Sequence, residues 1–119
     1  MAIVRVDQLE VFQTAHRIVL AIYRLTEKFP SHEQFGMISQ MRRAAVSVPA
    51  NIAEGFKRRG QRDKARFYNM SEGSLEEVRY YLRLAVDLNY TAQDEALPQL
   101  IDETARILHK LIESIEKRL

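Results

Sequence analysis

The residues with the clearest chemical potential in this 119-residue sequence form a basic run near its middle. Between residues 57 and 66 the run KRRGQRDKAR combines six cations with one acid, Asp63. The cations are Lys57, Arg58, Arg59, Arg62, Lys64 and Arg66. Cations this dense repel one another on a compact surface, and an anionic partner relieves the repulsion. Because phosphate is the commonest such partner and arginine binds it bidentately, these six residues predict a nucleic-acid-binding surface.

Other interpretations of the basic run stay open. Its cations could form a solvated helix end that complements the negative C-terminus of the preceding helix. They could also contact an acidic protein partner or a neighbouring subunit. Three aromatic residues flank the run. Phe67 falls in the predicted core pattern, whereas Phe56 and Tyr68 are expected as exposed platforms on which unpaired bases stack.

A second group of polar residues follows a helical spacing. Gln40, Ala44, Ser47, Asn51 and Glu54 recur at steps of three and four residues, and Ser74 and Glu77 share the apolar seam of a later segment. We expect the two groups to face each other, and buried polar groups then need partners. The predicted buried polar network comprises Arg43, Ser47, Asn51, Glu54, Ser74 and Glu77. A binding pocket and a subunit interface are the alternatives.

The remaining reactive residue types form no catalytic or metal-binding motif. The sequence has no cysteine, which excludes disulfides, thiolate catalysis and cysteine-ligated metals. Its three histidines lack the Glu-x-x-His pairs of a di-iron bundle, and His109 with Glu113 predicts a surface pair. The spacing of Gly55 and Gly60 lacks the lysine and hydroxyl that bind phosphate in a P-loop. We therefore predict no enzymatic activity, no metal and no cofactor.

Helices are predicted to position these residues. Apolar side chains recur every three or four residues, and no segment alternates as a strand does. The expected helices cover about 7–29, 31–55, 63–88 and 91–115, with Asp7–Glu10, Ser31–Gln34 and Thr91–Asp94 as capping pairs. Amphipathic helices of similar length joined by short loops predict an all-α, up-down-up-down antiparallel four-helix bundle, with residues 1–119 as one domain.

Charge and hydropathy add expectations about surroundings and assembly. The net charge is only +2, but residues 42–66 hold eight basic and two acidic side chains, so the rest of the chain is net acidic. No apolar run reaches the length of a membrane span and the N-terminus does not resemble a signal peptide, which predicts a cytoplasmic protein without membrane contact.

The first and last helices predict self-association. Both carry apolar residues around more than half of their circumference, more than one inward stripe requires. These residues are Val11, Phe12, Ile18, Val19, Ile22 and Tyr23 in the first helix and Ile107, Leu108, Leu111, Ile112 and Ile115 in the last. We therefore expect a homo-oligomer.

The middle of the chain resembles a known family. The block QMRRAAVSVPANIAEGFKRRG follows the pattern FP-x-x-E-x-x-G, which runs from Phe29 to Gly36, and precedes SEGSLEEVRYYLRLAVDLNY. It resembles the four-helix-bundle proteins encoded in intervening sequences of bacterial 23S ribosomal RNA genes, over about residues 7–112. Positions that match the family's pattern are Arg43, Ser47, Asn51, Glu54, Gly55, Gly73, Ser74 and Glu77.

The resemblance implies a homopentamer of four-helix bundles without assigned catalysis. The family is similar to the accessory variability protein of diversity-generating retroelements, which binds nucleic acid beside a reverse transcriptase. The resulting prediction is a non-enzymatic homo-oligomer, favoured as a pentamer, whose partners are RNA or DNA and a reverse transcriptase or another protein. The alternative is a structural or protein-interaction module with no nucleic-acid role.

Overall fold

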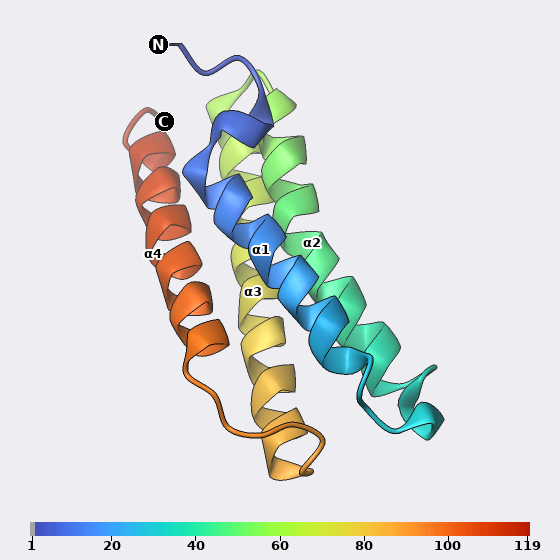
Figure 1. Ribbon diagram of the computed structural model, residues 1–119. Coiled ribbons are helices and arrows are strands. Elements are labelled where there is room, and N and C mark those ends of the chain that lie inside the picture. Colours follow the sequence, from blue (N-terminus) through green and yellow to red (C-terminus); the bar gives the residue numbers. More distant parts are fainter. Residues whose placement is uncertain (1) are drawn as a thin grey trace.

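The computed structural model describes residues 2–119, which form four long helices and two short 3-10 turns (Figure 1). They are η1 (Val6–Gln8), α1 (Glu10–Thr26), η2 (Ser31–Glu33), α2 (Met37–Lys57), α3 (Gln61–Asp87) and α4 (Ala96–Glu116). Successive helices run in opposite directions, and each contacts its two neighbours around the bundle. The predicted all-α, up-down-up-down four-helix bundle is therefore confirmed, without a strand in residues 2–119.

The core consists of the apolar stripes that the sequence spacing indicates. One side chain per helical turn points inward, because residues three and four apart share a face. On α2, for example, Met41, Ala45, Val48 and Ile52 are fully buried. They pack with stripes from the other helices that include Ile18, Ile22, Leu75, Val78, Ile101 and Leu108. Burial of this apolar surface is the main force that holds the helices together.

The start of α2 differs from the prediction. Neither Ser31 nor Gln34 caps this helix, which begins at Met37. Glu33 takes that role, since its Oε1 accepts a hydrogen bond from the Met37 backbone N–H at 3.3 Å. A Cβ at Gly36 would lie 2.9 Å from the same oxygen, so the absence of a side chain there makes room for the cap.

The other predicted caps have mixed outcomes. The first helix begins at Glu10 and has no side-chain cap, because Asp7 lies in η1 instead. Before α4, Asp94 does act on the helix start, since its Oδ1 accepts a hydrogen bond from the Ala96 N–H at 2.9 Å. Short polar side chains favour such positions, but the loop conformation decides which of them reaches the free N–H groups.

The predicted break after the third helix is confirmed. Asn89 adopts a left-handed conformation with φ of 62°, and the Tyr90 N–H donates to the Ala85 carbonyl at 2.9 Å, which closes the helix end. The Tyr90 hydroxyl then donates to Glu33 Oε2 at 2.8 Å, and its ring lies 5.4 Å from that of Phe29. These contacts join the α1–α2 and α3–α4 loops at one end of the bundle.

Exposed apolar surface lies only partly where the sequence predicted it, since Leu20 and Tyr23 of α1 are each 40% exposed. Of the residues expected to be in surplus on α1 and α4, Tyr23 is exposed and the others are buried or half-buried within the single chain. Large exposed apolar side chains also include Val46 on α2 and Met70 and Tyr80 on α3. The earlier reason for self-association is therefore wrong for α4, because its wide apolar face packs inside the bundle. No helix among residues 2–119 has the length and apolar character of a membrane span.

Candidate nucleic-acid interface

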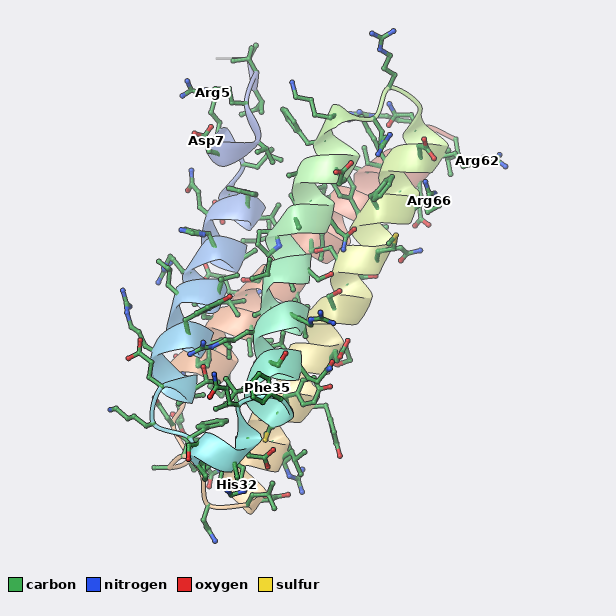
Figure 2. All side chains as sticks on the ribbon, turned by 90° about the vertical axis from the view of Figure 1, so that its right-hand side faces the viewer. Arg5, Asp7, His32, Phe35, Arg62 and Arg66 are labelled. Atoms are coloured by element: carbon green, nitrogen blue, oxygen red, sulfur yellow. The ribbon has the colours of Figure 1, made fainter. Side chains whose placement is uncertain are left out.

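The basic run forms the tight turn between α2 and α3. Residues 58–60 connect the two helices, so Lys57 belongs to α2, Arg58 and Arg59 lie in the turn, and Arg62, Lys64 and Arg66 belong to α3. Figure 2 shows Arg62 and Arg66 at this end of the bundle, with His32 and Phe35 at the opposite end. Because the turn is short and both flanking segments are helical, the backbone positions of these cations are fixed by the bundle.

A close helix–helix approach supports this turn. Gly55 is buried, and a Cβ there would lie 2.7 Å from Tyr68 Cε1 and 3.2 Å from Phe67 Cβ. Tyr68 packs against this glycine and is only 2% exposed, and burial raises the pKa of its hydroxyl. Tyr68 is therefore not the exposed stacking platform that the sequence predicted. Phe56 and Phe67 are half-buried.

Lys64 has a structural contact that the sequence did not reveal. Its Nζ donates to the carbonyl oxygens of Phe56 at 2.8 Å and Gly55 at 3.2 Å, in the last turn of α2. Partial burial lowers the pKa of this amine. The cation thus supplies a donor to the Phe56 carbonyl at the helix end and a second donor to the Gly55 carbonyl, which also accepts from the Arg58 N–H at 3.2 Å. For Lys64, the structure therefore shows the contact expected of a cation that complements the negative C-terminus of the preceding helix.

Arg58 and Arg66 lie against one aromatic ring. Their guanidinium carbons lie 4.6 Å and 4.5 Å from the centre of the Phe67 ring. Each also has a carboxylate partner: Arg58 pairs with Glu54 at 2.8 Å and Arg66 with Asp63 at 3.4 Å. Cation–π contact and ion pairing restrict both side chains, which nevertheless stay exposed to solvent.

The other three cations have no such partners. Lys57, Arg59 and Arg62 are exposed and form no side-chain hydrogen bond or ion pair with residues 2–119. We use the name basic corner for the exposed cations at the α2–α3 turn, which are Lys57, Arg58, Arg59, Arg62 and Arg66. Within it, the three unpaired side chains are the ones that an external anion meets without displacing a protein carboxylate.

The fold places the basic and the acidic segments of the sequence at opposite ends of the bundle. The basic corner lies at one end, near both chain termini (Figure 1). Segments 27–34 and 87–95 meet at the other end and together hold five acidic residues and one lysine. Antiparallel helices produce this separation, because successive turns alternate between the two ends.

Part of the predicted polar network exists in the seam between α2 and α3. The hydroxyl oxygens of Ser47 and Ser74 lie 2.8 Å apart, and Asn51 Nδ2 donates to Ser47 Oγ and to the Ser47 carbonyl, each at 2.9 Å. All three side chains are half-buried. The sequence did not identify Ser71, which is fully buried and donates to the Val48 carbonyl at 2.8 Å. Its position three residues before Ser74 is the signal that could have revealed it.

The prediction that charged residues belong to the buried network is wrong. Arg43, Glu54 and Glu77 are exposed, and Glu54 pairs with Arg58 of the basic corner. Glu77 lies near Tyr81, whose hydroxyl has a pKa raised by burial and by that carboxylate. The physical reason is the helical angle of about 100° per residue, which turns the outer members of a wide stripe toward solvent. Water then solvates these charges, and no buried ion pair is needed.

The residues that the structure describes offer no candidate metal site. Residues 2–119 contain no group of three or more histidine, aspartate or glutamate side chains that could hold a metal ion. His109 lies 3.6 Å from Glu72 and 3.9 Å from Glu113 on the exposed surface, as expected for a surface pair.

Comparison with known proteins gives one family. Residues 7–113 match the model of a family described as 23S rRNA-intervening sequence protein. No curated protein matches the chain.

Proposed function

Because the chain belongs to the 23S rRNA-intervening sequence protein family, we propose that it is a non-enzymatic, homo-oligomeric accessory protein that binds RNA or DNA. The basic corner is the observation that carries this proposal. Its cations project from two helix ends and from the short turn that joins them, so that little backbone ordering is needed when an anion binds. Phosphate groups of a nucleic-acid backbone match this charge without requiring a sequence-specific pocket.

The geometry favours contact with phosphates over stacking on bases. Tyr68 is buried, and the ring of Phe67 has two guanidinium groups against it. Among the flanking aromatics, Phe56 is half-buried with the Lys64 amine 5.7 Å from its ring centre. We therefore expect no preference for unpaired bases and weak sequence preference.

Assembly strengthens such binding. In the proposed pentamer, each subunit contributes one basic corner, and several corners on one rim engage a polymer with high effective concentration. The basic corner accounts only for binding of nucleic acid by this assembly. A reverse transcriptase or another protein remains a predicted partner.

The test is binding of mixed-sequence RNA and DNA across a salt series, measured by fluorescence anisotropy. The informative variant replaces Lys57, Arg59 and Arg62 by glutamine. Each lost phosphate contact lowers the salt slope by about 0.7–0.9, so the variant should lose a slope of about 2 to 3 for each subunit engaged. Its fold should be unchanged, because exposed unpaired cations contribute little to stability.

A matched control removes the same charge elsewhere. Arg17, Arg24 and Lys28 are exposed cations on α1 and the loop that follows it, and replacing them by glutamine should leave the salt slope nearly unchanged. Equal losses in the two triple variants would show that net charge alone governs binding. No binding by the parent protein at moderate salt would favour the protein-interaction module instead.

A further inference from the structure

The outer surface of α2 and α3 combines features that an isolated bundle does not require. Val46 is 41% exposed and Met70 is 47% exposed, although both are large apolar side chains in the middle of their helices. Small residues lie beside them: Ala50 is exposed, and a Cβ added at Gly73 would meet no atom within 4 Å. Apolar and small residues together permit close packing by another helix.

We use the name α2–α3 face for this surface. It comprises Arg43, Val46, Ser47, Ala50 and Asn51 on α2 and Met70, Gly73, Ser74, Glu77 and Leu84 on α3. The hydrogen-bonded cluster of Ser47, Asn51 and Ser74 lies in the seam between the two helices. Asn51 Oδ1 receives no hydrogen bond from residues 2–119, which leaves an acceptor at the middle of the face.

Opposite charges lie on the two sides of the α2–α3 face. Arg43 is on the α2 side and Glu77 on the α3 side, and neither forms an ion pair with any residue in the range 2–119. Ser47 and Ser74 are in contact across the seam. Arg43 precedes Ser47 by one turn and Glu77 follows Ser74 by about one turn. Because α2 and α3 are antiparallel, both charges lie one turn from this contact in the same direction, and so at the same height along the bundle.

We propose that the α2–α3 face is the surface through which copies of this chain pack together, with Arg43 of one copy paired with Glu77 of the partner subunit. This inference rests on the proposed homo-oligomer and assigns its contact. In a closed ring whose axis runs along the bundles, rotation preserves height. The α2 side of one copy then meets the α3 side of the next, and Arg43 faces Glu77 of the partner subunit around the whole ring.

Charge complementarity identifies a second copy as the occupant. Its charges, one arginine and one glutamate, give the α2–α3 face no net attraction for a phosphate backbone, in contrast to the basic corner. An identical chain supplies both opposite charges at matching heights, together with apolar side chains that cover Val46 and Met70. Parallel copies in such a ring also place every basic corner on the same rim, as multivalent nucleic-acid binding requires.

A charge-swap experiment tests the pairing. The mass of the full chain in solution is measured by light scattering coupled to size exclusion for the parent, Arg43→Glu, Glu77→Arg and the double swap. The parent should have a mass that is a multiple of 13.9 kDa. Each single swap places like charges together and should raise the concentration at which the assembly dissociates by about tenfold or more. The double swap restores opposite charges and should restore the parent's mass.

Control variants make the same charge changes on another helix. Arg106→Glu and Glu116→Arg alter exposed residues of α4 and should leave the mass unchanged, while circular dichroism confirms that every variant is folded. A monomeric parent would overturn both the homo-oligomer and this contact. An assembled parent whose single swaps stay assembled, or whose double swap does not reassemble, would overturn the Arg43–Glu77 pairing alone. The nucleic-acid-binding proposal is tested on other residues, by the salt slope of the basic-corner variant, so its failure is distinguishable from failure of the Arg43–Glu77 pairing.

Discussion

The close approach of α2 and α3 at Gly55 predicts opposite effects of the same substitution at two glycines of this bundle. Gly55 and Gly73 both lie inside helices, where alanine is intrinsically preferred by about 0.8–1.0 kcal/mol. Their surroundings differ. A Cβ at Gly55 would lie 2.7 Å and 2.9 Å from two ring carbons of Tyr68, whereas a Cβ at Gly73 would meet nothing within 4 Å.

The size of each effect follows from these distances. Tyr68 is 2% exposed and packed on all sides, so its ring has little freedom to move away from a methyl group at Gly55. Overpacking costs about 1–3 kcal/mol, and contacts below 3 Å to a ring that cannot move away lie in the upper part of this range, at about 2–3 kcal/mol, above the gain in helix propensity. We therefore expect Gly55→Ala to lower the free energy of unfolding by about 1–2 kcal/mol and Gly73→Ala to raise that of the isolated subunit by about 1 kcal/mol. Because Gly73 lies in the α2–α3 face, the comparison is made at a protein concentration at which the parent is dissociated.

The assay is urea unfolding followed by circular dichroism at one protein concentration, with light scattering to establish that the parent and both variants have equal mass. A second measurement combines Gly55→Ala with Tyr68→Leu, which removes the ring that the new methyl group meets. The double variant should be more stable than the sum of the single effects predicts. If Gly55→Ala is as stable as the parent, or if the two changes are simply additive, α2 and α3 do not approach each other as described.

Two further predictions concern residues that connect elements of the bundle. Lys64→Met keeps the apolar stem but removes the amine that donates to the Gly55 and Phe56 carbonyls, so it should lower the free energy of unfolding by about 0.5–1.5 kcal/mol while leaving RNA affinity nearly unchanged. Urea unfolding and anisotropy check this pair of results, and a large loss of affinity with full stability would return Lys64 to the binding surface. Tyr90→Phe removes the hydroxyl that donates to Glu33, a contact that lowers the pKa of Glu33 and raises that of Tyr90. The contact therefore stabilises the fold between the ordinary pKa of a glutamic acid and that of a tyrosine, and is lost below and above this range. Thermal unfolding across pH should show the largest difference between parent and Tyr90→Phe within that window, and a constant difference at every pH would contradict the assignment.

The sequence by itself determined the fold class and the location of the cations. Helical periodicity is a local property, because each turn repeats the same face every three to four residues. The stripe of Met41, Ala45, Val48 and Ile52 therefore identified both a helix and its buried side. The break after the predicted helix over 63–88 is local for a similar reason, since Asn89 follows that helix and asparagine tolerates the left-handed conformation that ends a helix.

Rotation of the helices about their own axes was decided only by the tertiary structure. On α3, aromatic residues occupy consecutive positions 67 and 68, so a shift of one residue changes which of them packs inside. Contact with Gly55 selects Tyr68, and the same rotation turns Met70 and Glu77 toward solvent. Periodicity cannot resolve a difference of about 100° when residues of similar hydrophobicity are adjacent.

The tertiary structure also decides which cations contact the protein and which stay exposed. In the sequence, Lys64 and Arg62 are equivalent members of one basic run. The turn between α2 and α3 brings Lys64 within reach of the last carbonyl groups of α2, and leaves Arg62 exposed beyond them. Composition determines how much charge a segment carries, but the partner of each charge depends on which distant backbone and side-chain groups the fold places within hydrogen-bonding distance.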